Sequence, residues 1–138
     1  KIIYDDRLKE MNYGNWDGKP AAEIHAKYPQ AFDDLGYFTE NYSDYCTGET
    51  YRQLADRLMD FWHDLVNKHV NESVVLVFHG TASRSLVQNI LESTGISKIG
   101  EMQNAGVTNI SVDDTSKKAF LRYYNRSAPC DFFLEPKS

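Results

Sequence analysis

His79 stands where an imidazole side chain is suited to chemistry on an anion. It directly follows an apolar run, residues 74–78, and precedes Gly80 and a helix-like segment. In open α/β sheets, ligands bind at the carboxyl ends of strands, and the free N–H groups of a helix N-terminus favour phosphate or carboxylate. The sequence therefore predicts an anion-binding site at His79, Gly80 and Thr81. Arg84, one turn into the expected helix, is a further candidate phosphate ligand.

Glu10 is the candidate general acid. It lies in a loop that contains Gly14, Trp16 and Gly18. These residue types indicate a loop of defined conformation, in which we expect the carboxylic acid to be partly removed from water. Partial desolvation favours the protonated form of a carboxylic acid, as a general acid working near neutral pH requires. Two structural alternatives stand beside these assignments: Glu10 as a solvated loop glutamate, and His79 as a hydrogen-bonded structural histidine.

The elements expected to position His79 are a strand and a helix. Residues 74–78 are five consecutive apolar residues, three of them β-branched, which predicts a strand buried on both faces within a parallel sheet. Apolar residues then recur at helical spacing. This pattern predicts a helix over residues 83–93, with Thr81 or Ser83 as its N-cap.

A long amphipathic helix is predicted over residues 49–69. Its apolar stripe is wide enough to lie against a sheet and consists of Tyr51, Leu54, Ala55, Leu58, Phe61, Trp62, Leu65 and Val66. Gly48, Glu49 and Thr50 suit the start of this helix as turn glycine, first-turn acid and capping hydroxyl. Arg57 falls on the polar side, where we expect it to be exposed or paired with an acid.

The alternation of helices and strands predicts a layered α/β domain. Apolar residues 107–112 and strand-like residues 118–124 are separated by too few residues for a helical crossover, so they should form an antiparallel hairpin. Together with the strand at residues 74–78, this pattern indicates a three-layer α/β/α domain. Its central sheet would be mostly parallel, with an antiparallel C-terminal hairpin or edge.

The first third of the chain is less regular. Residues 1–4 resemble the end of a strand, and Pro20 suits the first turn of a short helix that ends near Lys27. The aromatic side chains of residues 30–47 are placed to roof a pocket. A sheet of so few strands, with this many helices to cover it, indicates that an element is missing before Lys1.

Composition excludes several classes of protein. The 138 residues suffice for one domain with a real core, and 41% hydrophobic and 25% charged residues are ordinary for a soluble globular protein. A net charge of −5 with scattered Lys and Arg argues against a nucleic-acid surface, and no apolar run is long enough to span a membrane. Cys46 and Cys130 lack metal-ligand spacing, so we expect free thiols in a reducing, cytoplasmic compartment, with a secreted protein carrying one disulfide as the alternative.

Two N-terminal segments resemble motifs of the histidine phosphatase superfamily, the group that includes cofactor-dependent phosphoglycerate mutase. Residues 7–18 are similar to the family's L-x-E-x-x-x-G-x-W-[ED]-G loop. Gly48-Glu49-Thr50, with Arg57 seven residues after the threonine, is similar to its G-E-[ST] helix start.

Two later segments extend the resemblance over nearly the whole chain. Residues 74–80 resemble the strand that ends in the family's second His-Gly, although Phe78 stands where serine is commoner. Residues 104–108 resemble its late Asn-small-x segment, and Tyr124-Asn125 the end of its closing strand. The order and spacing of these pieces indicate kinship with the family.

The resemblance implies a phosphoglycerate mutase-like α/β fold and a two-step reaction. In this family a first histidine, in an Arg-His-Gly motif, attacks phosphorus and becomes phosphohistidine, and water then releases phosphate. Glu10 corresponds to the glutamate that gives a proton to the leaving oxygen. His79 corresponds to the second histidine, which stabilises the transferring phosphoryl group. The resemblance implies no metal and no organic cofactor.

The sequence departs from the family pattern because it contains no Arg-His-Gly. We therefore expect residues 1–138 to be a single, N-terminally incomplete histidine-phosphatase-like domain that lacks its nucleophile and is inactive alone. The alternatives are a partial or engineered fragment, and a natural relative without the nucleophile that binds a phosphorylated ligand or a protein.

The expected reaction of the complete protein is hydrolysis of small phosphomonoesters. The excursion between Trp16 and Gly48 is shorter than in phosphoglycerate mutases, which favours a phosphatase and leaves a mutase as the alternative. The expected partner is a small phosphorylated substrate, with no nucleic acid and no membrane. We expect either a homo-oligomer or the missing N-terminal segment to cover the exposed sheet.

Overall fold

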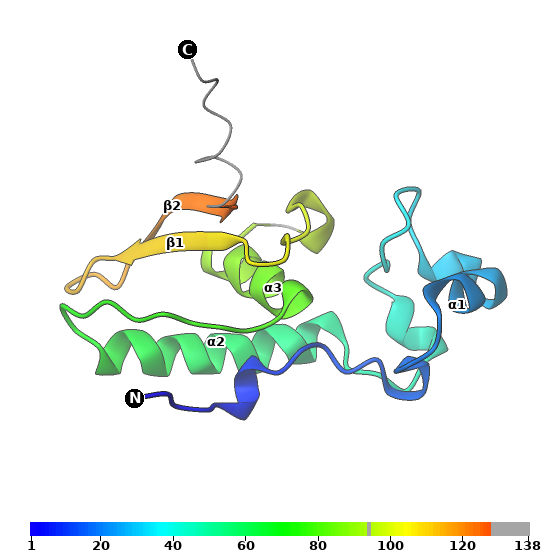
Figure 1. Ribbon diagram of the computed structural model, residues 1–138, viewed down its shortest axis with the longest axis horizontal. Coiled ribbons are helices and arrows are strands. Elements are labelled where there is room, and N and C mark those ends of the chain that lie inside the picture. The colour runs from blue at the N-terminus through cyan, green and yellow to red at the C-terminus, as the bar shows by residue number, and fades with distance from the viewer. Residues whose placement is uncertain (94, 128–138) are drawn as a thin grey trace, which may run out of the picture.

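A computed structural model describes residues 1–93 and 95–127. Its longer elements are α1 (Ala21–Lys27), α2 (Tyr51–Lys68), α3 (Gly80–Ile90), β1 (Val107–Val112) and β2 (Ala119–Arg126). Short 3-10 helices occur at η1 (Asp6–Leu8), η2 (Gly14–Trp16), η3 (Pro29–Ala31), η4 (Tyr42–Tyr45) and η5 (Ile96–Lys98). In Figure 1, α2 runs below α3 and the β1–β2 ribbon, and α1 lies at the opposite end from the hairpin turn.

The long helix predicted over residues 49–69 is confirmed as α2, with Thr50 as its N-cap. The prediction that Glu49 is an acid of the first turn is wrong, because Glu49 precedes the cap. The helix begins with a capping box: the Thr50 hydroxyl accepts from the Gln53 N–H at 3.1 Å, and the Gln53 side-chain oxygen accepts from the Thr50 N–H at 2.8 Å. This exchange satisfies two N–H groups that a helix otherwise leaves unpaired. The helix buries Leu54, Leu58, Phe61 and Trp62, as its apolar stripe predicts.

The second predicted helix forms as α3, but it begins at Gly80 and its N-cap is His79. The prediction that Thr81 or Ser83 caps this helix is wrong. The reason is that Glu10, from a distant loop, supplies the oxygens that bind the first N–H groups of the helix. A local capping hydroxyl is therefore not needed.

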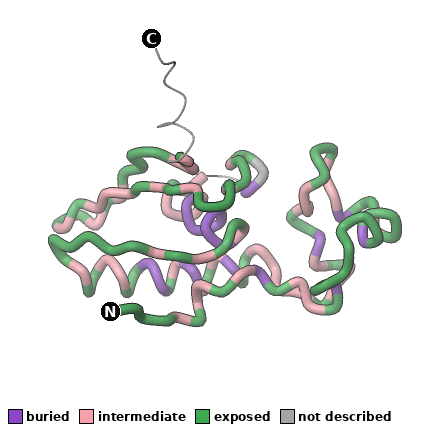
Figure 2. The backbone as a smooth tube through the Cα atoms, in the orientation of Figure 1, coloured by how far each residue is buried: buried purple, intermediate pink, exposed green. Residues whose placement is uncertain are grey.

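One apolar core joins α2 and α3 to the N-terminal loop (Figure 2). The buried members of this core are Met11, Trp16, Ile24, Ala31, Tyr42, Leu54, Leu58, Trp62, Ala82 and Leu86. The members of this core come from residues 11–86. The N-terminal loop, the aromatic segment at residues 30–47 and the two helices therefore depend on the same packing. Within residues 1–93 and 95–127, no helix combines the length and apolar character that crossing a membrane requires.

The predicted antiparallel hairpin is confirmed: β1 pairs with β2, with Val112 opposite Ala119 and Val107 opposite Arg126. The ammonium group of Lys117, in the turn, donates to the Val66 carbonyl at 3.0 Å and so attaches the hairpin to α2.

The predicted strand at residues 74–78 is not a strand in this structure. Residues 72–79 run alongside α2 without ladder hydrogen bonds to any described residue (Figure 1). Leu76 and Phe78 pack against the core, whereas Val75 and Val77 are 86% and 88% exposed, so the segment is buried on one face only. A strand forms its ladder hydrogen bonds with neighbouring strands. No strand in the described part of the chain lies beside residues 74–78.

The three-layer arrangement is accordingly not seen in the described residues, whose sheet consists of β1 and β2. Residues 1–4 form no strand either, and Ile2, Ile3 and Tyr4 are largely exposed. In the described residues, the unpaired segment 72–79 lies between α2 and the antiparallel ribbon of β1 and β2.

The aromatic excursion forms a packed cluster of rings. Trp16 stacks on Phe38 with ring centroids 5.6 Å apart, and Phe38 in turn contacts Tyr42 at 5.1 Å and Phe32 at 4.7 Å. These rings contact Trp16 of the N-terminal loop and Tyr51 at the start of α2. That residues 30–47 roof a pocket stays a prediction.

Leu58→Ala tests the core. Leu58 is 0% exposed, so truncation should lower the free energy of unfolding by about 2–5 kcal/mol, through lost burial and the cavity left behind. Leu35→Ala is the matched control because Leu35 is 77% exposed, and it should change stability by less than about 0.5 kcal/mol. Urea denaturation measures both, and equal effects would contradict the assignment of Leu58 to the core.

Candidate active site

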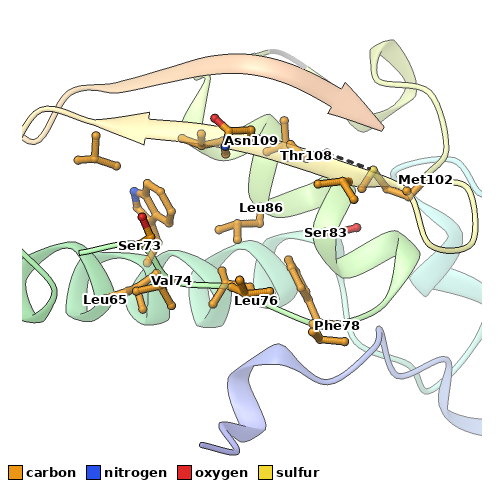
Figure 3. A pocket seen from close by; sticks show the side chains of 18 of the residues that line it. Leu65, Ser73, Val74, Leu76, Phe78, Ser83, Leu86, Met102, Thr108 and Asn109 are labelled. Atoms are coloured by element: carbon orange, nitrogen blue, oxygen red, sulfur yellow. Dashed lines mark hydrogen bonds between the residues drawn. The ribbon is translucent and has the colours of Figure 1, made fainter. Parts of the chain in front are cut away.

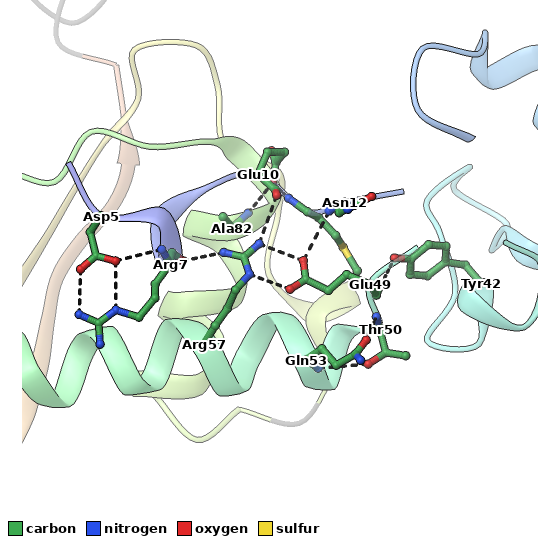
Figure 4. Close-up of polar contacts among 11 residues, drawn as sticks. Asp5, Arg7, Glu10, Asn12, Tyr42, Glu49, Thr50, Gln53, Arg57 and Ala82 are labelled. Carbon is green, nitrogen blue, oxygen red and sulfur yellow. Dashed lines mark hydrogen bonds and ion pairs between the residues drawn. The ribbon is translucent and has the colours of Figure 1, made fainter. Parts of the chain in front are cut away.

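The Glu10 carboxylate is bound by three backbone N–H groups. One oxygen accepts from Met11 at 2.8 Å and from Ala82 at 3.0 Å, and the other accepts from Thr81 at 3.2 Å. Thr81 and Ala82 belong to the first turn of α3, where N–H groups and the helix dipole favour negative charge. The N-terminus of α3 therefore holds a carboxylate that comes from 71 residues earlier in the chain (Figure 4).

His79 lies directly before these N–H groups and is exposed. Its backbone is extended, and its carbonyl accepts from the Ser83 N–H at 2.9 Å, which leaves the imidazole outside the helix. A Cβ added to Gly80 would meet nothing within 4 Å, so open space adjoins the backbone here. Glu10, His79, Gly80 and Thr81 are thus brought together at one helix end.

Tyr13 borders the same helix end. Its hydroxyl lies 3.4 Å from the Thr81 hydroxyl, and its ring contacts Phe38 and Tyr42. Burial raises the pKa of Tyr13, so its hydroxyl is protonated at neutral pH and available as a donor. Tyr13 is not predictable as a site residue from the sequence, where its only signal is that an aromatic residue stands three positions after Glu10.

Arg84 is engaged within the fold. Its side chain is buried, its Nε and Nη2 groups donate to the Ile96 carbonyl at 3.1 and 2.7 Å, and its guanidinium lies 5.4 Å from the centre of the Tyr37 ring. These contacts attach α3 to the residues that follow it. The assignment of Arg84 as a phosphate ligand stays a prediction.

The loop that carries Glu10 is attached to α2 by Arg57. The guanidinium pairs with both oxygens of Glu49, at 2.7 and 2.9 Å, which confirms that Arg57 is a paired charge. It also donates to the carbonyl oxygens of Arg7, at 2.5 Å, and of Glu10, at 3.2 Å (Figure 4). One side chain of α2 thereby holds both ends of the segment that positions the candidate acid.

Reciprocal bonds join the same loop to the start of α2. The Glu49 N–H donates to the Asn12 carbonyl at 2.6 Å, and the Asn12 N–H donates weakly to the Glu49 carboxylate at 3.4 Å. The Asn15 N–H donates to the Thr47 hydroxyl and the Thr47 N–H to the Asn15 side chain, both at 3.0 Å. The two motifs that the sequence analysis treated separately therefore form one structural unit.

A second attachment to α2 is made by Arg7. Its guanidinium contacts Asp5, Asp60 and Asp64 at 2.6–2.8 Å. The hydrogen bond from Arg7 holds the pKa of Asp5 below its usual value, and the three acids raise the pKa of Arg7. Because Asp60 and Asp64 are largely exposed, each of these pairs contributes little to stability on its own.

A groove of about 1030 Å³ lies between residues 72–79 and β1, and His79 lines it (Figure 3). Its walls combine apolar side chains, among them Trp62, Leu65 and Leu86 from the two helices, with polar ones. β1 pairs with β2 along one edge, and its other edge has no partner strand among the described residues. Unpaired backbone thus borders the groove on both sides.

The residue types that bind metals are dispersed. Within the described residues, no group of three or more His, Cys, Asp and Glu side chains could hold a metal ion. Cys46 is a free thiol, and Cys130 lies outside the described residues. The site described above consists of one carboxylate, one imidazole and backbone N–H groups.

Comparison with known sequences identifies the family. The profile of the Histidine phosphatase superfamily (branch 1) matches residues 1–126. The chain is 31% identical over 114 residues to a metal-independent phosphoserine phosphatase of Arabidopsis thaliana, covering 83% of this chain and 47% of that protein. It is 27% identical over 134 residues to the uncharacterized phosphatase PhoE of Bacillus subtilis (strain 168), covering 97% of this chain and 62% of that protein.

Solved structures agree on the fold. A mycobacterial glucosyl-3-phosphoglycerate phosphatase, solved with VO3, superposes with a TM-score of 0.72 at 26% identity, over 91% of this chain and 65% of that one. YhfR of Bacillus stearothermophilus superposes with a TM-score of 0.72 at 24% identity, over 90% and 61%. These neighbours indicate an α/β fold. The chain spans between 47% and 65% of the length of these four proteins. Because the family profile covers nearly its whole length, the chain belongs to the histidine phosphatase superfamily.

Proposed function

We propose that residues 1–138 form the larger part of a phosphatase domain that hydrolyses small phosphomonoesters through a phosphohistidine intermediate. The observation that supports this most directly is the position of Glu10, whose carboxylate is bound to α3 within three residues of His79. The relatives' names support hydrolysis, because they are a phosphoserine phosphatase, a fructose-2,6-bisphosphatase and a glucosyl-3-phosphoglycerate phosphatase.

The proposal divides the work among three groups. The nucleophile is a histidine of the complete protein outside residues 1–138, and its ring nitrogen attacks phosphorus. Glu10 is the general acid. The His79 side chain and the N–H groups of Gly80 and Thr81 bind the phosphoryl oxygens, on which negative charge rests in the transition state. Arg84, which is tied to Ile96, supports the helix in this scheme.

Each step conserves atoms and charge. In the first, a P–N bond to the nucleophilic histidine forms, the P–O bond to the leaving group breaks, and Glu10 gives its proton to the leaving oxygen. In the second, water attacks phosphorus, the P–N bond breaks and Glu10 takes the proton of the water. Inorganic phosphate and an alcohol are the products, and Glu10 returns to its protonated form.

The same proposal accounts for the groove. In the complete protein, a strand from the segment that precedes residue 1 would lie between residues 72–79 and β1 and pair with both. Three observations support it: apolar side chains line part of the groove, unpaired backbone borders it on both sides, and the neighbours are longer than this chain. Such a strand completes a mostly parallel central sheet and the three-layer α/β/α arrangement, and it delivers the nucleophile to the end of the groove where His79 lies.

Hydrogen exchange on the complete protein tests the strand. The backbone N–H groups of Val75 and Val77 should exchange slowly, because ladder hydrogen bonds protect them from solvent. Asp34, in an exposed loop, is the control and should exchange fast. Rapid exchange at residues 74–78 in the complete protein would overturn the proposed sheet.

Glu10→Gln tests the general acid in the complete protein. With an alkyl phosphate, whose leaving group needs a proton, kcat should fall about 10²- to 10⁴-fold. With p-nitrophenyl phosphate, whose leaving group departs as an anion, the loss should be much smaller. Glu23→Gln is the control because Glu23 is exposed on α1. Equal losses on both substrates would exclude Glu10 as the acid, and phosphate binding without turnover by the wild type would favour a binding protein.

His79→Ala tests the stabilisation of charge. Loss of one group that stabilises the transferring phosphoryl should lower kcat about 10²- to 10³-fold. Because His79 is exposed, the free energy of unfolding should change by less than about 0.5 kcal/mol. His63→Ala, at an exposed position of α2, should alter neither quantity. Unimpaired turnover in His79→Ala would remove His79 from the mechanism.

A further inference from the structure

Glu10 is held from two opposite sides, by two different helices. Its side chain binds the Thr81 and Ala82 N–H groups of α3. Its main chain is held by α2, where Arg57 donates to the Glu10 carbonyl at 3.2 Å. The position of the carboxylate therefore depends on a guanidinium that touches the backbone of Glu10 and has no hydrogen bond to its carboxylate (Figure 4).

Arg57 is itself fixed in place. Its Nε and Nη2 groups form a bidentate pair with Glu49, and the side chains of Arg57 and Glu49 are only 22% and 16% exposed. Arg57 uses four of the five N–H donors of a guanidinium, on Glu49, the Arg7 carbonyl and the Glu10 carbonyl. Little donor capacity is left for a phosphate, so the geometry favours a role in placing other groups.

Glu49 completes the arrangement from the start of α2. Its N–H donates to the Asn12 carbonyl at 2.6 Å, and its carboxylate orients Arg57. The pair thus contacts the loop at three points: at Arg7 before the acid, at Glu10 itself, and at Asn12 after it. Catalytic groups lose efficiency steeply when displaced, since a misplacement of about 1 Å can cost about 100-fold in rate.

We propose that Arg57 and Glu49 are positioning residues for the general acid: the ion pair between Arg57 on α2 and Glu49, just before α2, sets the distance of the Glu10 carboxylate from α3 and hence from the leaving oxygen. This inference rests on the proposed function, because it assigns Glu10 the proton transfer. It adds two residues that act through Glu10 without touching substrate.

The test uses Arg57→Lys and Glu49→Gln in the complete protein. A lysine keeps the charge but cannot bridge Glu49 and two carbonyls at once, and a glutamine keeps the shape but weakens the ion pair. Both variants should lower kcat about tenfold or more on an alkyl phosphate, and much less on p-nitrophenyl phosphate, with KM nearly unchanged. Arg52→Lys is the matched control, because Arg52 is 89% exposed on the same helix.

Combination with Glu10→Gln separates positioning from a general loss of structure. If Arg57 acts only through the acid, Arg57→Lys should cause no further loss in kcat once Glu10 is glutamine. Additive losses, or equal losses on both substrates in the single variants, would overturn the proposal. If Arg57→Lys fails to fold, the same comparison of kcat, with and without Glu10→Gln, is made with Glu49→Gln.

The outcomes also separate this inference from the proposed function. Absence of turnover in the wild type, or a Glu10→Gln variant that slows both substrates equally, would overturn the proposed function and the positioning with it. Suppose instead that the wild type and Glu10→Gln behave as proposed, but Arg57→Lys and Glu49→Gln keep the same kcat as the Arg52→Lys control. That result would overturn the positioning role alone.

Discussion

Two backbone segments, residues 12–15 and 47–49, approach each other closely at Gly14 and Gly48, and the site depends on that contact. A Cβ on Gly14 would lie 2.5 Å from the Thr47 carbonyl carbon, and one on Gly48 would lie 2.7 Å from the Asn12 carbonyl oxygen. Gly14 also has a φ of +58°, which side-chain-bearing residues rarely adopt. Glycine at both positions lets the loop lie directly against the start of α2, where Arg57 and Glu49 can reach it.

The two sides of this contact have different chemistry. On one side lie the charged and polar groups that hold Glu10, and on the other lie the rings of the aromatic cluster. Burial raises the pKa of Tyr42 and of Tyr51, so both hydroxyls remain protonated and donate, to the carbonyl oxygens of Glu49 and Phe38. The cluster is thereby attached to the start of α2. We infer that the aromatic excursion stabilises the loop that carries the acid.

Features set by neighbouring residues were predictable from the sequence, and features set by distant ones were not. The α2 capping box and the hairpin follow from local spacing, and both formed. The segment at residues 74–78 has a strand's composition but no paired neighbour among the described residues. The N-cap prediction for α3 failed because the capping oxygens belong to Glu10. The sequence indicates that Arg57 is exposed or paired with an acid and that Glu49 belongs to the start of a helix. That the two residues hold Glu10 follows only from the folded loop.

The carboxylate at the end of α3 makes the structural and the catalytic interpretations of Glu10 compatible. A helix N-terminus stabilises whichever anion occupies it. In the structure, Glu10 satisfies the Thr81 and Ala82 N–H groups. In the proposed reaction, a phosphoryl group bound by the Thr81 N–H replaces one anionic acceptor with another, so few hydrogen bonds are lost.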